Sequence, residues 1–301
     1  MPGIGGTGKG NFEMEKKYFQ KPSVYVGEVN IRVTDLQKSI RFYRDIFGFK
    51  ILSESERKAV FSANGKTPLL TLEQPEGVAP KAGRTAGLYH FAILLPTRED
   101  LSSFLQHLIK QQGYNIRLGA SDHYVSEALY FDDPDGNGIE VARDRHSSEW
   151  NWNGDTVEMA TVPLDAEGLL KETDKQWEGV PEDTLMGHIH LHVSDLQETE
   201  NFYVNGLGFN IVTRYPGALF ASTNGYHHHL GLNVWNGVGA PKAPKNSAGL
   251  NWFSLEFPDE ATLQTAAEKL TNLGAKVTLE NGVHIVEDPA GNTIHLRVEQ
   301  R

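Results

Sequence analysis

One stretch of this chain combines the alternation of a β-strand with a row of histidines. From Gly187 to Val193 the sequence reads GHIHLHV, so apolar side chains fall on one face and His188, His190 and His192 on the other. Three imidazoles on one face could bind a metal ion or transfer protons. For each histidine taken singly, the alternative is a polar rim with one or two buried, hydrogen-bonded rings.

A second histidine cluster occupies residues 227–229 and runs directly into LGLN at 230–233, which is typical of a strand. This continuation favours a structured position over an exposed surface cluster. Strand alternation would place His228 on one face, with His227 and His229 on the other.

The elements that must position these residues repeat along the chain. Residues 27–36, GEVNIRVTDL, are echoed by residues 187–196, GHIHLHVSDL. The echo continues through three further pairs of segments: Phe42-Tyr43 and Phe202-Tyr203, Ala86-Gly87-Leu88 and Ala248-Gly249-Leu250, Asp133-Pro134 and Asp288-Pro289. Thr34 and Gln37 have the spacing of a capping box, which predicts the start of a helix. Because each repeat divides again into strand, helix and several strands, we expect an α+β protein of four βαβββ modules.

The repeat defines the expected domain organisation. We predict a flexible tail over 1–23, an N-terminal half over 24–145, a polar linker over 146–183, and a C-terminal half over 184–299. Each half contains two modules. The tail includes GIGGTGK, which nearly matches a phosphate-binding loop, but Gly10 stands where such a loop needs Ser or Thr. We therefore interpret its glycines as a sign of flexibility.

The pattern D-L-x-x-x-x-x-F-Y begins at Asp35 and again at Asp195. Together with the four modules, it resembles the vicinal oxygen chelate superfamily, which contains glyoxalases, extradiol dioxygenases and antibiotic-resistance proteins. The resemblance covers nearly everything from residue 25 to residue 299. It implies two glyoxalase-like halves in which curled mixed sheets surround a metal site. By the family pattern, the ligands come from the first and last strands of the modules.

The family's ligand positions correspond to six residues of this chain: Glu28, His90, His188 and Trp252 on first strands, and Glu140 and His295 on last strands. Pairing modules within a half would give Glu28/His90/Glu140 or His188/Trp252/His295. Pairing the second module with the third gives His90, Glu140 and His188. Two imidazoles and one carboxylate are the set of an open-sided Fe(II) site, with Mn(II) as the alternative ion. We prefer this pairing, and we expect the site of modules one and four to be degenerate.

Three more residues resemble the ring-cleaving extradiol dioxygenases of the superfamily. Their His-His-x-Leu pattern selects His228 as an acid–base residue that does not bind the metal. Their Tyr ten residues before the metal Glu, with a His upstream, corresponds to Tyr130 and His123, expected to hydrogen-bond the substrate oxygen and the ring-opened intermediate. The resemblance implies Fe(II)-dependent insertion of O2 into a small catechol-type aromatic diol, giving a muconic semialdehyde.

Two other functions are compatible with the same fold. A glyoxalase-type isomerase or thiol transferase would favour the within-half ligand set with two carboxylates, and it needs no redox step. A metal-free binding protein would leave the ligand set without a purpose. The acid–base and hydrogen-bonding residues discriminate, because only the dioxygenase needs all three together. The roles of His190, His192 and His284 stay open.

Composition excludes several classes of protein. The chain has 301 residues and no cysteine, which excludes disulfides, zinc ribbons, iron–sulfur clusters and thiol nucleophiles. A net charge of −11 without a basic run disfavours nucleic acid as a partner. No stretch has the length and apolar character of a membrane helix or a signal peptide. We therefore expect a cytoplasmic protein that does not associate with membranes and could form a homo-oligomer.

Overall fold

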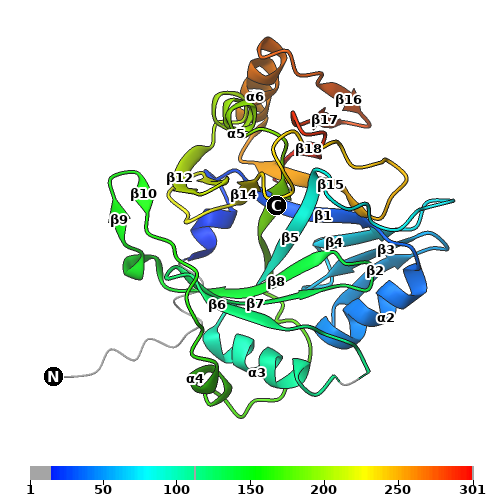
Figure 1. Cartoon of the computed structure of the whole chain (residues 1–301), viewed down its shortest axis with the longest axis vertical. Coiled ribbons are helices and arrows are strands. Elements are labelled where there is room, and N and C mark those ends of the chain that lie inside the picture. Colours follow the sequence, from blue (N-terminus) through cyan, green and yellow to red (C-terminus); the bar gives the residue numbers. More distant parts are fainter. Residues whose placement is uncertain (1–14, 112, 300–301) are drawn as a thin grey trace.

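The structure is a computed structural model, and it describes residues 15–111 and 113–299. Its framework is two curled eight-stranded sheets (Figure 1). The strands of the first sheet, which we call the terminal sheet, are in spatial order β16 (Thr278–Glu280), β17 (Val283–Glu287), β18 (Thr293–Val298), β15 (Gly249–Phe257), β1 (Tyr25–Arg32), β4 (Leu70–Glu73), β3 (Lys58–Ser62) and β2 (Lys50–Glu54). Those of the second, the middle sheet, are β12 (Asn210–Tyr215), β13 (Ala218–Ser222), β14 (Leu230–Asn233), β11 (Leu185–His192), β5 (Gly87–Leu94), β8 (Gly138–Asp144), β7 (Ser126–Asp132) and β6 (Gly119–Asp122).

Each sheet takes one module from each half of the sequence. The terminal sheet joins modules one and four through the antiparallel pair β1 and β15. The middle sheet joins modules two and three through the antiparallel pair β5 and β11. The α+β fold of four modules is therefore confirmed, and so is the expected pairing of the second module with the third.

A helix follows the first strand of every module. These helices are α2 (Leu36–Phe47), α3 (Arg98–Leu108), α5 (Leu196–Glu200), which continues as the π-helical segment η3 (Asn201–Gly206), and α6 (Glu260–Asn272). Helix α2 buries Leu36, Ile40, Tyr43 and Phe47, as the helical spacing of these residues requires.

The start of α2 differs from the capping box expected at Thr34 and Gln37. The residue that caps the helix is Asp35, whose carboxylate accepts a hydrogen bond from the backbone N–H of Lys38. The Thr34 hydroxyl does not cap the helix and instead donates to Asp135 at 2.5 Å. Helix α2 ends at Gly48, whose φ of 70° lies in the left-handed region that favours glycine.

The F-Y and Asp-Pro motifs of the repeat meet in the core. The buried Tyr43 hydroxyl donates to Asp133 at 2.9 Å, and the buried Tyr203 hydroxyl donates to Asp288 at 3.0 Å. Burial and the neighbouring carboxylate hold the pKa of each tyrosine well above its usual value, so both hydroxyls stay protonated donors. The helix of one module is thereby bonded to the last hairpin of the next module in sequence.

The N-terminal segment and the linker carry more structure than expected. Residues 1–14 of the expected flexible tail lie outside the described residues. The 3-10 helix η1 (Lys16–Phe19) buries Tyr18 and Phe19 against Trp150 and Tyr226, so residues 15–23 pack on the fold instead of forming a free tail. The linker contains four short elements: η2 (Ser147–Glu149), β9 (Trp152–Asn153), β10 (Thr156–Val157) and α4 (Ala166–Leu170). Among the described residues, no helix has the length and apolar character needed to cross a membrane.

Candidate metal centre

Three neighbouring strands of the middle sheet direct the candidate ligands to one face. His188 on β11 lies opposite Ala92 on β5, and Ala92 in turn lies opposite Glu140 on β8. Residues opposite one another in a sheet share a face, as do residues two apart on one strand. His90, two residues before Ala92, therefore joins the other two. His190 lies opposite His90 and shares the same face.

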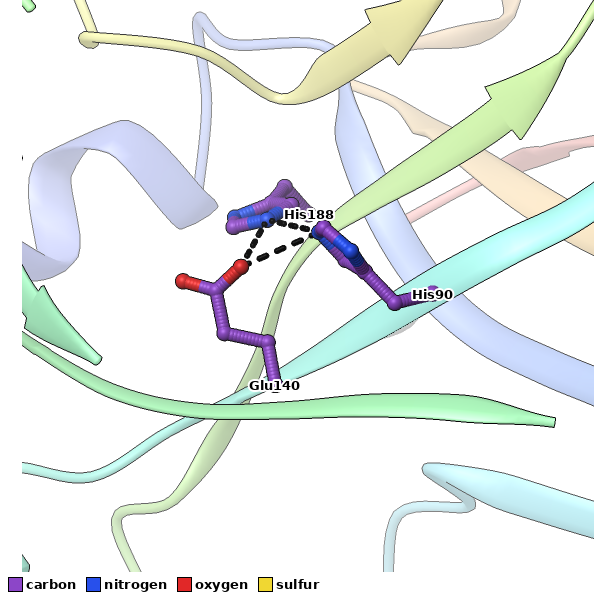
Figure 2. A group of neighbouring side chains, drawn as sticks. All are labelled: His90, Glu140 and His188. Carbon is purple, nitrogen blue, oxygen red and sulfur yellow. Dashed lines mark hydrogen bonds and ion pairs between the residues drawn. The ribbon is translucent and has the colours of Figure 1, made fainter. Parts of the chain in front are cut away.

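The donor atoms of these side chains converge to a small triangle (Figure 2). His90 Nε2 lies 3.0 Å from Glu140 Oε2 and 3.2 Å from His188 Nε2, and His188 Nε2 lies 3.1 Å from the same carboxylate oxygen. All three side chains are buried. In the described part of the chain, this is the one group of three or more metal-ligating side chains with converging donors.

The three donors lie close enough together to bind one ion. Ligands about 2.1 Å from a shared ion are about 3.0 to 3.4 Å apart, and the separations of 3.0, 3.1 and 3.2 Å fall in this range. Two imidazoles and one carboxylate suit a divalent transition metal.

The electrostatics of the triangle favour the ionisation states that metal binding needs. Burial lowers the pKa of His90, because a charged imidazole is poorly solvated there. Burial alone would raise the pKa of Glu140, but the charge and hydrogen bonds of His188 and His90 outweigh it and hold that pKa well below its usual range. The ionised carboxylate is ready to bind a cation, whereas an imidazole nitrogen that donates to Glu140 gives up its hydrogen when it binds one.

A cavity of about 320 Å³ opens above the triangle, within the size range of small-molecule sites. The other expected site residues, His123, Tyr130 and His228, all line it. Met159, Ala160 and Thr161 from the linker, and the aromatic residues Tyr89, Phe220 and Trp235, complete much of the wall. Sequence reasoning missed these wall residues, since their types are common in strands and loops and only the fold brings them together.

His123 and Tyr130 form one hydrogen-bonded unit at the edge of the cavity. His123 Nδ1 donates to the Ala160 carbonyl at 2.6 Å, so its Nε2 is the acceptor for the Tyr130 hydroxyl at 2.5 Å. Tyr130 lies opposite Glu140 in the pair β7 and β8. Burial and the nearby Glu140 carboxylate hold the pKa of Tyr130 well above its usual value, so its hydroxyl stays protonated.

The three consecutive histidines are buried, which excludes the surface-cluster interpretation. The centroid of the His228 ring lies 4.2 Å from that of the His188 ring, and His228 lines the cavity. Burial lowers the pKa of His228 well below its ordinary value, and the charges of His188 and His227 act in the same direction. His229 instead hydrogen-bonds the Tyr18 carbonyl at 3.0 Å.

The expectation that His227 points to the opposite face from His228 is wrong. The two rings contact each other through their Nδ1 atoms at 2.8 Å. Strand alternation does not apply, because β14 begins only at Leu230, so the histidines belong to the preceding loop.

His190 and His192 are satisfied by a single amide. Asn233 bonds His190 Nε2 at 3.0 Å through its amide nitrogen and His192 Nδ1 at 2.7 Å through its amide oxygen. The polar-rim alternative therefore describes these two histidines, while His188 joins the triangle. His284 lies on β17 of the terminal sheet.

The matching positions of the terminal sheet assemble no comparable donor set among the described residues. Trp252 and His295 stack at 4.1 Å with their planes 10° apart. Glu28 pairs with Arg297 at 2.8 Å and accepts the Thr71 hydroxyl at 2.6 Å. These contacts engage Glu28, Trp252 and His295 with other partners, and the two within-half ligand sets are not brought together.

The chain belongs to the Glyoxalase/Bleomycin resistance protein/Dioxygenase superfamily, whose family model matches residues 25–141 and 185–296. Within it, the protein groups with the dioxygenases. It is 43% identical over 271 residues to catechol-2,3-dioxygenase of Bacillus subtilis (strain 168), an alignment that covers 88% of this chain and 94% of the relative.

More distant relatives cover less of the chain or share only its fold. The metallothiol transferase FosB of Lysinibacillus sphaericus (strain C3-41) is 28% identical over 108 residues, covering 36% of this chain and 74% of the relative. The crystal structure of glyoxalase I from Zea mays has a TM-score of 0.55 and 20% identity, covering 91% of this chain and 92% of that one. The maize structure supports the fold assignment alone.

Proposed function

We propose that this protein is an Fe(II)-dependent extradiol dioxygenase that cleaves catechol-type diols to muconic semialdehydes. The observation that carries the proposal is a single cavity with a His90/Glu140/His188 triangle at its base and His228 beside it. Its 43% identity to a catechol-2,3-dioxygenase supports the same reaction. Mn(II) is the alternative ion, because the donor set suits both metals.

Each part of the site has a distinct task in this reaction. Bound to the triangle, Fe(II) would supply a path for electron density from the electron-rich ring to triplet O2, with which a singlet organic molecule reacts poorly. His228 takes the proton of one substrate hydroxyl and later returns it. The Tyr130 hydroxyl, held by His123 Nε2, orients the substrate oxygen and hydrogen-bonds the ring-opened intermediate.

The cavity wall favours an uncharged diol. Met159, Phe220 and Trp235 supply apolar surface, and the described residues that line the cavity include no lysine or arginine. Apart from the metal, a ring carboxylate would find no lysine or arginine to pair with there, and its desolvation would be costly. Catechol and its neutral derivatives are therefore the proposed substrates.

Anaerobic reconstitution tests the proposal directly. The protein is loaded with Fe(II) without oxygen, catechol is added, and air is then admitted while O2 uptake and a yellow ring-fission product are followed. We expect one O2 consumed for each catechol cleaved. Iron-loaded protein that consumes no O2 with any neutral catechol would contradict the proposal. Isomerase or thiol-transferase turnover without O2 would favour the other enzyme class instead.

A further inference from the structure

A chain of hydrogen bonds continues behind His228, away from the cavity. His228 Nδ1 lies 2.8 Å from His227 Nδ1, and His227 Nε2 lies 2.9 Å from Asp144 Oδ1. The other carboxylate oxygen of Asp144 accepts the Tyr226 hydroxyl at 2.8 Å. The motif that selects His228 assigns no role to Asp144, His227 or Tyr226.

The direction of each hydrogen bond in this chain follows from the Asp144 carboxylate. An ionised carboxylate only accepts hydrogen bonds, so His227 Nε2 carries a hydrogen. Where this is the one ring hydrogen of His227, its Nδ1 is unprotonated and accepts from the Nδ1–H of His228. The remaining ring nitrogen of His228, Nε2, is left unprotonated. His228 lines the cavity, so this free nitrogen is the one available to a bound molecule.

The arrangement is buried. His227 is 1% exposed, and the Asp144 side chain is 7% exposed, so water does not compete for their bonds. Asp144 ends β8, the strand that also carries Glu140, so the carboxylate behind His228 and the candidate metal ligand are positioned by one element. The ring of Tyr226 packs against His227, with centroids 4.0 Å apart and the planes tilted by 34°.

We propose that Asp144 and His227 are positioning residues that fix the His228 tautomer with Nε2 as the free base. This inference rests on the proposed dioxygenase function. In the step it serves, the substrate O–H bond breaks and an Nε2–H bond forms on His228. The positive charge gained by that ring is stabilised through its Nδ1–H bond to His227 and the Asp144 carboxylate behind it. The same proton returns from Nε2 to a product oxygen, so His228 is unchanged after turnover.

The tautomer of His228 can be measured by nitrogen-15 NMR of the metal-free full chain with labelled histidines. This measurement needs no turnover. The His228 signals are assigned by comparison with a His228→Gln variant. We expect an Nδ1 shift typical of a protonated nitrogen and an Nε2 shift typical of an unprotonated one. The reverse assignment, with the hydrogen on Nε2, would overturn the proposal. Because no reaction is required, this result is independent of whether the protein cleaves catechols.

An Asp144→Asn variant tests the consequence for catalysis. The amide can donate to His227 Nε2, which would reverse both bonds and place the hydrogen of His228 on Nε2. We expect iron content and KM for catechol to stay close to wild type while kcat falls by about 10²- to 10⁴-fold, the range for a lost general base. The NMR signature of His228 should reverse in the same variant.

His229→Gln is the matched control, because it changes the next histidine in sequence, which bonds Tyr18 instead of His228. We expect this control to keep both kcat and the His228 signature. Wild-type kcat in Asp144→Asn, or a His228 signature that does not respond to the change, would refute the positioning role. If Asp144→Asn does not fold, the wild-type NMR measurement still decides the tautomer.

Discussion

The stability of this protein at acid pH should depend measurably on His229. The buried ring accepts the Thr223 N–H at 3.3 Å on Nδ1 and donates to the Tyr18 carbonyl from Nε2, so its neutral form satisfies both partners. Burial, reinforced by the charges of His227 and His188, lowers its pKa from 6.5 to about 3. Protonation would place an unpaired charge between the N-terminal segment and the middle sheet.

The sign and size of the effect follow from linkage. Between pH 6.5 and pH 3 the unfolded chain binds a proton at His229 that the folded chain does not bind, so the free energy of unfolding falls as pH falls. Each pH unit below 6.5 costs about 1.4 kcal/mol, which gives about 2 kcal/mol at pH 5. Other buried histidines add to the total, so the comparison must isolate this one.

The contribution of His229 is isolated by measuring the free energy of unfolding in urea for the wild type and for His229→Gln, each at about pH 7 and pH 5. Glutamine keeps a donor for the Tyr18 carbonyl and cannot gain a proton. Wild type should lose about 2 kcal/mol more than the variant between the two pH values. Equal losses in the two proteins would refute the assignment of a strongly lowered pKa to His229.

Three further predictions concern the candidate metal centre. Glu140→Gln and His90→Ala should each lose bound iron, measured by elemental analysis. Both variants should keep the circular dichroism spectrum of the wild type, because an extensive apolar core holds the fold. Collapse of the spectrum in both variants would instead identify a structural metal site. His188→Ala should also lose iron. Glu28→Ala should keep it, because Glu28 pairs with Arg297 in the other sheet. Iron lost from Glu28→Ala but kept by His188→Ala would exclude a site with ligands from both halves. His228→Gln should retain iron and bind catechol but turn over about 10²- to 10⁴-fold more slowly in an O2-uptake assay, and iron loss in this variant would identify His228 as a ligand.

The donor triangle was predictable from one local signal together with the family pattern. Alternation on one strand placed His188 on a polar face, and the family's ligand positions corresponded to His90 and Glu140. The burial of Tyr18 could not be predicted in the same way, because it depends on partners far away in sequence. The bond between His227 and Asp144 depends on a loop conformation that has no periodicity. The family pattern predicted that module two pairs with module three, and the strand order of the middle sheet confirms this pairing.

The pairing of modules also sets the order in which the chain can fold during synthesis. The middle sheet is continuous in sequence, from β5 to β14, so it can form as soon as residue 233 is available. In contrast, β1 near the N-terminus pairs with β15, which is complete only at residue 257. At about 5–20 residues per second, β1 waits roughly 10–45 s for this partner. During that interval the first module presents an open strand edge, and the site-bearing sheet is complete only near its end, so crowded nascent chains are exposed to pairing with one another until β15 is available.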